Sequence, residues 1–312
     1  MDMPLDPNAA QLLESMAATM PPVETMKPQE ARAASSKLAA LLPTTPPKSE
    51  ITERSVPVDE GDVRVRIYRP ATEHPLPVFL YIHGGGWVLG GDLEIYDPLC
   101  DRLANEAECM VVSVGYRLAP ECPFPAPLED CYAVAKWVVS SAAELGIDPG
   151  RVAVGGDSSG ANLAAALALV CRDRGGPALC FQVLVYPPVI CRRQSSDYPE
   201  GLDVAVLSRA AMVWYWNHYL PLAANDSDPY ASPLLADDLS ALPPALVITA
   251  EYDVLRDEAR AYVGCLEQSS VPVLHRHYED MFHGFFGFGS VLPQAREAVT
   301  EAAAALFRAL HA

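Results

Sequence analysis

Short apolar segments of strand length recur along most of the chain, and most are separated from the next by a segment with helical spacing. The strand-like segments are Val63–Tyr68, Val78–Ile82, Cys109–Val114, Arg151–Val154, Leu179–Val185, Ala245–Ala250 and Pro272–Tyr278. The helical segments are Leu93–Ala107, Pro127–Leu145, Ser159–Arg174 and Asp257–Gln268. Val63–Tyr68 alternates charged and apolar residues, as a half-exposed strand does, but several of the others are nearly continuous apolar runs, which are typical of a sheet covered on both faces. Their alternation with helices is typical of βαβ units. The sequence therefore predicts an α/β fold with a mostly parallel central sheet flanked by helices.

Two segments depart from this alternation. Residues 1–50 contain the helical patterns Pro7–Thr19 and Pro28–Leu42, broken apart by prolines, and have too few apolar residues for a core of their own. A long connection before Ala245 contains the aromatic-rich helical stretch Ser208–Tyr219. A core helix with extra packing is one interpretation of this stretch, and an insertion that folds over a site is the other.

We therefore expect a main domain of residues 51–312. An N-terminal helical segment of residues 1–50 and an insertion at about 190–225 are expected to form a cap on it.

The charge of the chain excludes some classes of partner. The formal net charge is −18, and Lys and Arg form no cluster. Nucleic acids and anionic membrane surfaces are bound by clustered basic side chains, so neither is an expected partner. No stretch of about 18 uncharged apolar residues suggests a membrane helix.

Cysteine usage indicates a reducing compartment. The eight cysteines show neither a CxxC pair nor metal-ligand spacing, so we expect free thiols. The segment Met1–Ala18 carries acidic residues and lacks the basic start of a signal peptide. We expect a cytoplasmic protein.

The pentapeptide Gly156-Asp157-Ser158-Ser159-Gly160 fits the pattern G-x-S-x-G. It lies between the strand Arg151–Val154 and the helix Ser159–Arg174, which is the context of a nucleophile elbow. Such a turn is too tight for side chains two residues either side of the serine, and it lifts the Ser158 hydroxyl to a helix start. An ordinary helix-start turn is the alternative. We predict that Ser158 is a nucleophile and that the Ser159 amide faces the oxyanion.

A second glycine-rich motif, His83-Gly84-Gly85-Gly86-Trp87, directly follows the strand Val78–Ile82. Three glycines leave backbone N–H groups uncovered, so they can supply the other donors of an oxyanion hole. A phosphate loop is excluded because its Lys and Ser/Thr are missing. We expect His83 to hold the loop and not to act as a base.

The base and the acid are expected at the carboxyl ends of the last two strands. His283 lies in a loop just beyond Pro272–Tyr278, and His277 is its main rival. Asp253 follows Ala245–Ala250 and precedes the base in the chain, as the order Ser…Asp/Glu…His requires, with Glu251 as its competitor.

These motifs resemble the hormone-sensitive-lipase-like family of bacterial esterases, in the subgroup whose nucleophile motif is GDSAG. The resemblance covers nearly the whole chain and includes the two glycine motifs, Tyr116-Arg117-Leu118-Ala119-Pro120-Glu121, Ala231-Ser232-Pro233-Leu234, Asp253-Val254-Leu255-Arg256-Asp257-Glu258 and His283-Gly284-Phe285. It implies the α/β-hydrolase fold with a helical cap, and an oxyanion hole made by the amides of Gly84, Gly85, Gly86 and Ser159. The chain departs from the family pattern at Ser159, where Ala is usual, at Ala161, where Gly is common, and at Val254, where Pro is usual.

The resulting prediction is a carboxylesterase that hydrolyses short- to medium-chain acyl esters through Ser158, His283 and Asp253, with no metal and no cofactor. An amidase or deacetylase with the same triad, a lipase for long chains and a non-catalytic ligand receptor are the alternatives. The pocket is expected to include Trp87, Tyr186 and Trp214. The last strand could lie at the sheet edge and pair with a second copy, giving a homodimer.

Overall fold

The structure is a computed structural model and describes residues 4–40, 43, 45–72, 75–222 and 224–312. In this part of the chain one eight-stranded sheet has the order β1-β2-β4-β3-β5-β6-β7-β8. The pairs β1–β2 and β2–β4 are antiparallel and the others are parallel. The strands are β1 Glu50–Val58, β2 Gly61–Arg69, β3 Leu76–Ile82, β4 Met110–Gly115, β5 Ile147–Asp157, β6 Phe181–Val185, β7 Ala245–Tyr252 and β8 Val273–Phe282.

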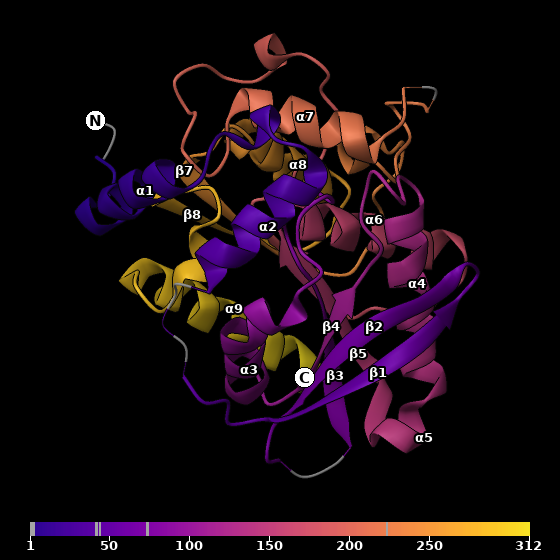
Figure 1. The fold of residues 1–312 in the computed structure, drawn as a ribbon. Coiled ribbons are helices and arrows are strands. Elements are labelled where there is room, and N and C mark those ends of the chain that lie inside the picture. The colour runs from indigo at the N-terminus through magenta and orange to yellow at the C-terminus, as the bar shows by residue number, and fades with distance from the viewer. Residues whose placement is uncertain (1–3, 41–42, 44, 73–74, 223) are drawn as a thin grey trace.

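Helices lie on both sides of this sheet, so the predicted α/β architecture is confirmed (Figure 1). The α-helices are α1 Pro7–Thr19, α2 Pro28–Ala39, α3 Asp97–Glu106, α4 Ala126–Ser140, α5 Ala142–Leu145, α6 Ser159–Asp173, α7 Arg209–Tyr219, α8 Arg256–Gln268 and α9 Pro293–Leu310. The 3₁₀ turns are η1 Val23–Thr25, η2 Leu93–Tyr96, η3 Ser195–Asp197, η4 Pro233–Leu235 and η5 Phe285–Phe288. Among the described residues, no helix is both long enough and apolar enough to cross a bilayer.

The strand β3 shows how the sheet is buried on both faces. All seven of its residues are buried. Val78, Leu80 and Ile82 belong to the core that contains residues of α4, α6 and α8. Phe79 and Tyr81 point to the other face and belong to the core that contains residues of α3 and α9. Because side chains alternate along a strand, each strand residue is covered by one helical layer or the other.

Two elements, β1 and α9, are absent from the elements predicted above. β1 lies at the sheet edge, buries only Val56 fully and contains Pro57, so its apolar signal is weak. α9 buries Ala295, Val299, Ala302 and Leu306, which have clear helical spacing that could have identified it. The last two residues of the predicted helix Pro28–Leu42, and residues 1–3 of the predicted cap segment, lie outside the described residues.

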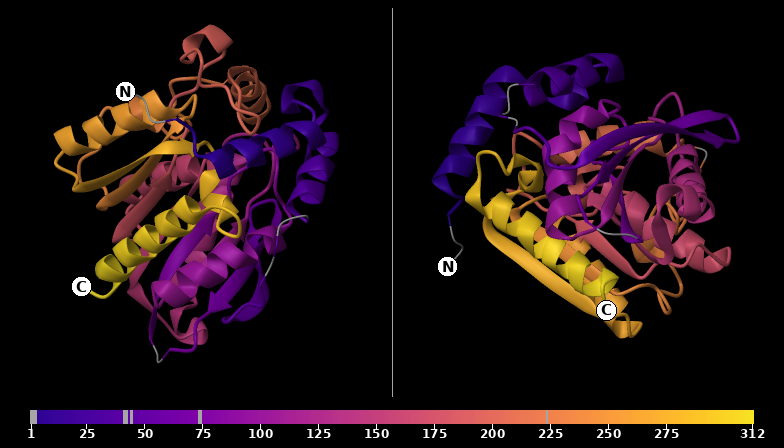
Figure 2. Two further views of the ribbon diagram at one scale, coloured as in Figure 1. Left: turned by 90° about the vertical axis from the view of Figure 1, so that its left-hand side faces the viewer. Right: turned by 90° about the horizontal axis from the view of Figure 1, so that it is seen from below.

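The N-terminal helices and α7 lie on the same side of the molecule (Figures 1 and 2). Ala9 and Leu13 of α1 pack in the same core as Phe282 and Phe285. The turn η1 contacts α7, and the Ser208 hydroxyl donates a hydrogen bond to the Glu24 carboxylate at 3.4 Å. The first segment of the chain and the insertion before β7 are therefore neighbours in space.

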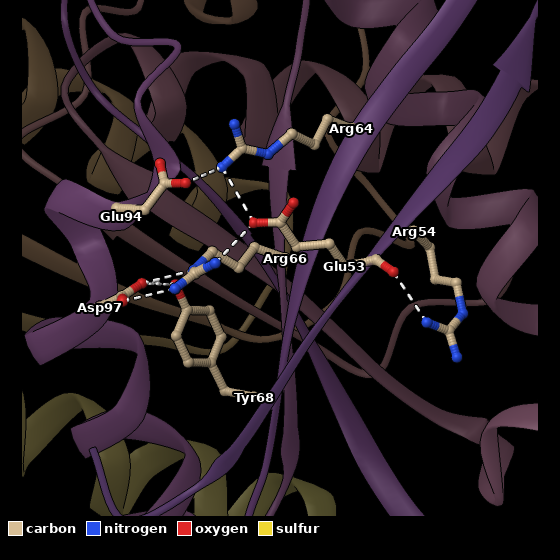
Figure 3. A network of polar contacts seen from close by, with 7 residues as sticks. All are labelled: Glu53, Arg54, Arg64, Arg66, Tyr68, Glu94 and Asp97. Carbon is tan, nitrogen blue, oxygen red and sulfur yellow. Dashed lines mark hydrogen bonds and ion pairs between the residues drawn. The ribbon is translucent and has the colours of Figure 1, made fainter. Parts of the chain in front are cut away.

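A network of ion pairs ties the antiparallel edge of the sheet to the start of α3 (Figure 3). Glu53 of β1 accepts hydrogen bonds from Arg66 at 2.6 Å and from Arg64 at 3.2 Å. Arg66 also binds both carboxylate oxygens of Asp97 at 2.7 Å, and the Tyr68 hydroxyl donates to Asp97 at 2.7 Å. Asp97 is the first residue of α3, so this bidentate pair fixes the helix against the edge strands.

Candidate active site

Ser158 lies in the turn between β5 and α6 with φ 53° and ψ −123°, a strained conformation for a residue other than glycine. Its N–H donates to the Val185 carbonyl at 2.8 Å. A Cβ at Gly156 or Gly160 would lie 2.1 or 2.0 Å from the Ile82 carbonyl oxygen. Glycine is therefore required at both positions, because β3 passes directly against the turn.

The structure brings Ser158, His283 and Asp253 together. The Nε2 atom of His283 lies 2.9 Å from the Ser158 Oγ, and its Nδ1 atom lies 2.8 Å from the Asp253 Oδ2. His283 and Asp253 are almost fully buried, with exposed fractions of 3% and 0%. An ionised carboxylate accepts the Nδ1–H, so the Nε2 lone pair faces the serine hydroxyl. This arrangement suits proton removal from Ser158.

The pairing of β7 with β8 positions the acid and the base. The register shifts between Ala250 and Tyr252, after which Tyr252 pairs with Phe282. The Tyr252 carbonyl then accepts the His283 N–H at 3.1 Å. Asp253 follows directly, and its Oδ1 accepts the Leu255 N–H at 2.8 Å, which holds the carboxylate in the turn before α8.

The two rivals, His277 and Glu251, contact each other and do not contact Ser158. His277 lies 2.9 Å from the Glu251 carboxylate and 2.9 Å from the Thr249 hydroxyl. Glu251 also forms an ion pair with Arg256. These residues form a separate cluster on β7, β8 and the start of α8.

The backbone of the glycine loop has two N–H groups free to bind a ligand. The Gly84 carbonyl accepts from His83 Nδ1 at 2.8 Å, and the Gly85 carbonyl accepts from the Leu89 N–H at 2.8 Å. The N–H and C=O of a trans peptide point in opposite directions, so the N–H groups of Gly85 and Gly86 point away from these contacts. The described part of the chain offers neither N–H an acceptor.

The Gly84 amide, predicted above as part of the oxyanion hole, already has an acceptor in the structure. The Gly84 N–H donates to the Asp157 Oδ1 at 3.0 Å, and the same oxygen accepts the Tyr81 hydroxyl at 2.5 Å. Burial raises the pKa of Asp157, and the hydrogen bonds from Tyr81 and Gly84 oppose that rise. The Gly84 N–H is therefore used to fix the loop on the residue next to the nucleophile.

His83 is held as a structural residue in the core. It is fully buried, and its ring stacks on Tyr116 at 4.3 Å and on Tyr96 at 5.2 Å between ring centroids. Burial lowers the pKa of His83 to about 4, so the ring is neutral at physiological pH. Its Nδ1–H therefore donates to the Gly84 carbonyl and orients the peptide that carries the Gly85 N–H.

The three predicted pocket residues lie in different surroundings. Trp87 has no exposed surface and stacks on Tyr219 at 4.3 Å between ring centroids, so it packs inside the core. The Tyr186 ring lies 4.5 Å from the His283 ring, directly beside the triad. Trp214 is partly buried on α7 and packs edge-on against Tyr215.

Three supporting residues could not be found by motif alone. Asp157 and Tyr116 lie within motifs, but the motifs do not indicate what these side chains contact. In the structure Asp157 accepts the Gly84 N–H, and the Tyr116 hydroxyl donates to the His83 carbonyl at 3.0 Å. Tyr215 lies against the loop from α7, where a Cβ on Gly86 would lie 2.1 Å from its ring. Each contact joins elements that are far apart in the sequence.

Comparison with known proteins identifies related chains. A family model described as alpha/beta hydrolase fold matches residues 79–287. Carboxylesterase NlhH of Mycobacterium tuberculosis is 40% identical over 313 residues, which cover 99% of this chain and 97% of the relative. Ethyl acetate hydrolase of Pseudomonas putida is 36% identical over 320 residues, which cover 97% and 99%. The solved structure of a hyperthermophilic esterase from the archaeon Pyrobaculum calidifontis has a TM-score of 0.90 at 41% identity and covers 98% of this chain and 99% of its own.

Proposed function

Because the chain belongs to the alpha/beta hydrolase fold family, we propose that it is a carboxylic ester hydrolase that uses Ser158 as its nucleophile. The observation that carries this proposal is the continuous contact from Asp253 through His283 to the Ser158 hydroxyl, at 2.8 and 2.9 Å. The chain matches relatives named carboxylesterase and ethyl acetate hydrolase over nearly their full lengths, which supports the same chemistry.

The reaction proceeds through an acyl-enzyme. His283 takes the Ser158 proton as the Oγ attacks the ester carbonyl, and the carbonyl oxygen becomes an oxyanion. The N–H groups of Gly85, Gly86 and Ser159 stabilise it, the last because it is the first N–H of α6 and has no acceptor within the helix. The alcohol leaves with the proton from His283.

Deacylation repeats these steps with water in place of Ser158. His283 removes a proton from the water as its oxygen attacks the acyl carbon, and then gives this proton to the Ser158 Oγ as the bond to the serine breaks and the acid is released. The Asp253 carboxylate holds the His283 ring through Nδ1 and stabilises the imidazolium that forms in each half of the reaction.

The cap is proposed to bound the acyl pocket. Residues 1–50 and the insertion at about 190–225 meet where η1 contacts α7. Tyr186 is almost fully buried and packs beside the triad, and the partly buried Trp214 supplies apolar surface on the cap. Because a cap of this kind encloses its substrate, we propose short- to medium-chain acyl esters as substrates.

A cytoplasmic location and a homodimer complete the proposal. All eight cysteines are free, which is the usual state of thiols in a reducing compartment. β8 ends the sheet and carries main-chain groups that a second copy could pair with.

The test of the proposed function is the variant Ser158→Ala. Hydrolysis of p-nitrophenyl butyrate should fall by roughly 10⁴-fold or more, because the nucleophile is removed. Labelling by a fluorophosphonate should be lost as well. Ser140→Ala, which removes an exposed hydroxyl on α4, is the control and should retain both. Full esterase activity in Ser158→Ala would refute the assignment.

The wild-type protein separates the related alternatives in the same assay. Rates on acetyl, butyryl, octanoyl and palmitoyl esters should fall off at the longest chain, and an ester should be cleaved much faster than its amide analogue. Preference for the palmitoyl ester would favour a lipase, and preference for the amide would favour an amidase.

A further inference from the structure

The motif Tyr116–Glu121 has no part in the chemistry described above, yet it lies directly against the glycine loop. The Tyr116 hydroxyl donates to the His83 carbonyl at 3.0 Å, and the Ala119 N–H donates to the Trp87 carbonyl at 2.9 Å. Two residues of the motif thus hold the loop that carries Gly85 and Gly86. The motif is itself anchored on α4, where Asp130, a fully buried carboxylate, accepts hydrogen bonds from the Arg117 N–H and guanidinium at 2.7–3.1 Å.

One side chain of the cap joins this motif to the loop. Arg32 of α2 donates through Nε to the Val88 carbonyl at 2.7 Å and through a terminal nitrogen to the Ala119 carbonyl at 2.7 Å. The same guanidinium binds both carboxylate oxygens of Glu121 at 2.9 and 2.6 Å. Arginine suits this position because its rigid fork can satisfy three acceptors at once.

The contact with Val88 begins a chain of hydrogen bonds that ends at the proposed oxyanion hole. The Val88 carbonyl and the Leu89 N–H belong to one peptide group, and this N–H donates to the Gly85 carbonyl at 2.8 Å. The Gly85 carbonyl in turn shares a peptide group with the Gly86 N–H. A cation at one end of such a chain polarises each peptide group and strengthens the donor at the other end.

We infer that Arg32 is a positioning residue for the oxyanion hole, through which the cap orients and polarises the Gly86 N–H across two peptide groups. This inference rests on the proposed function. It gives the N-terminal segment a role in transition-state stabilisation in addition to covering the pocket. An interaction that acts only on the oxyanion changes kcat and leaves substrate binding almost unaltered.

The test uses the full chain with Arg32→Met, which keeps the apolar stem and removes every N–H donor of the side chain. Arg32→Lys is the second variant, because it keeps the charge near Glu121 but lacks the fork that reaches three acceptors. Arg54→Met is the matched control. Arg54 is exposed on β1, and its guanidinium donates to the backbone oxygen of Glu53 at 2.8 Å (Figure 3).

The readouts are kcat and KM on p-nitrophenyl butyrate and the inhibition constant of a trifluoromethyl ketone, whose adduct with Ser158 carries an oxyanion. Arg32→Met should lower kcat by roughly 10- to 100-fold, because displacing or weakening the Gly86 N–H costs nearly as much as removing a donor from the oxyanion hole. KM should stay within about twofold, and ketone inhibition should weaken in proportion to kcat/KM. Arg32→Lys should lie between Arg32→Met and the wild type, and Arg54→Met should match the wild type.

Unchanged kcat and ketone inhibition in a folded Arg32→Met protein would overturn the inference, and so would a rise in KM alone. If Arg32→Met does not fold, the same two criteria apply to Arg32→Lys. Failure of the proposed function is distinguishable, because the wild type would then lack esterase activity and Ser158 labelling from the outset.

Discussion

At the scale of single residues, Glu258 shows how burial alone can make stability depend on pH. Its side chain is 2% exposed, and its two carboxylate oxygens accept from the Val189 N–H at 2.9 Å and from Arg192 at 3.2 Å. Burial raises the pKa of Glu258 from 4.5 to about 7. Between these values the native state binds more protons than the unfolded chain, so the free energy of unfolding should fall as pH rises.

Glu258→Gln should remove this part of the pH dependence. The wild-type fall in unfolding free energy that should disappear is roughly 3 kcal/mol between pH 4.5 and 7, since one pKa unit corresponds to about 1.4 kcal/mol. Urea unfolding of both proteins at several pH values measures it. Glu267→Gln, at an exposed position of the same helix, should keep the wild-type slope. An identical slope in Glu258→Gln would show that the buried carboxylate is not responsible.

At the scale of secondary-structure elements, the contact between β3 and the start of α6 limits what the nucleophile turn can accept. A Cβ on Gly160 would lie 2.0 Å from the Ile82 carbonyl oxygen and 2.6 Å from that of His83. Gly160→Ala must therefore push α6 away from β3, at a cost of roughly 1–3 kcal/mol or more in unfolding free energy. Because both Ser158 and the glycine loop move with these elements, esterase activity should fall as well.

The matched control is Gly264→Ala in α8, where a Cβ would meet no atom within 4 Å in the described structure. This change should stabilise the protein by roughly 0.5–1 kcal/mol, because alanine favours the helix more than glycine does. Thermal and denaturant unfolding compare the two variants. Equal effects of the two substitutions would contradict the close contact at the turn.

At the scale of the whole molecule, the sheet order leaves β1 and β8 as edge strands. Leu274 and Tyr278 on β8 are only partly buried in a single chain, so they can contribute apolar surface to an interface. We predict a homodimer in solution. Multi-angle light scattering should give twice the chain mass of 33.6 kDa. A single species of 33.6 kDa at micromolar concentration would contradict the prediction.

Much of this architecture could be predicted because its signals are local. The apolar run of β3 predicts a strand buried on both faces, and the position of Ser158 between a strand and a helix predicts the turn. The edge position of the last strand was also expected and is found. β1 escaped prediction because an edge strand needs few apolar residues, whereas α9 carried a helical pattern that should have been recognised.

The sequence by itself determined the α/β class, the glycine pattern of the nucleophile turn and a small set of candidate side chains, because each depends on neighbours within a few residues. The tertiary structure alone decided which candidates meet. It placed His283 and not His277 beside Ser158, engaged the Gly84 N–H with Asp157 and buried Trp87 against Tyr219. The contact of Arg32 with Val88 is of the same kind. Hydrogen bonds and packing act over a few ångströms in space, and only the folded chain brings such distant residues within that range.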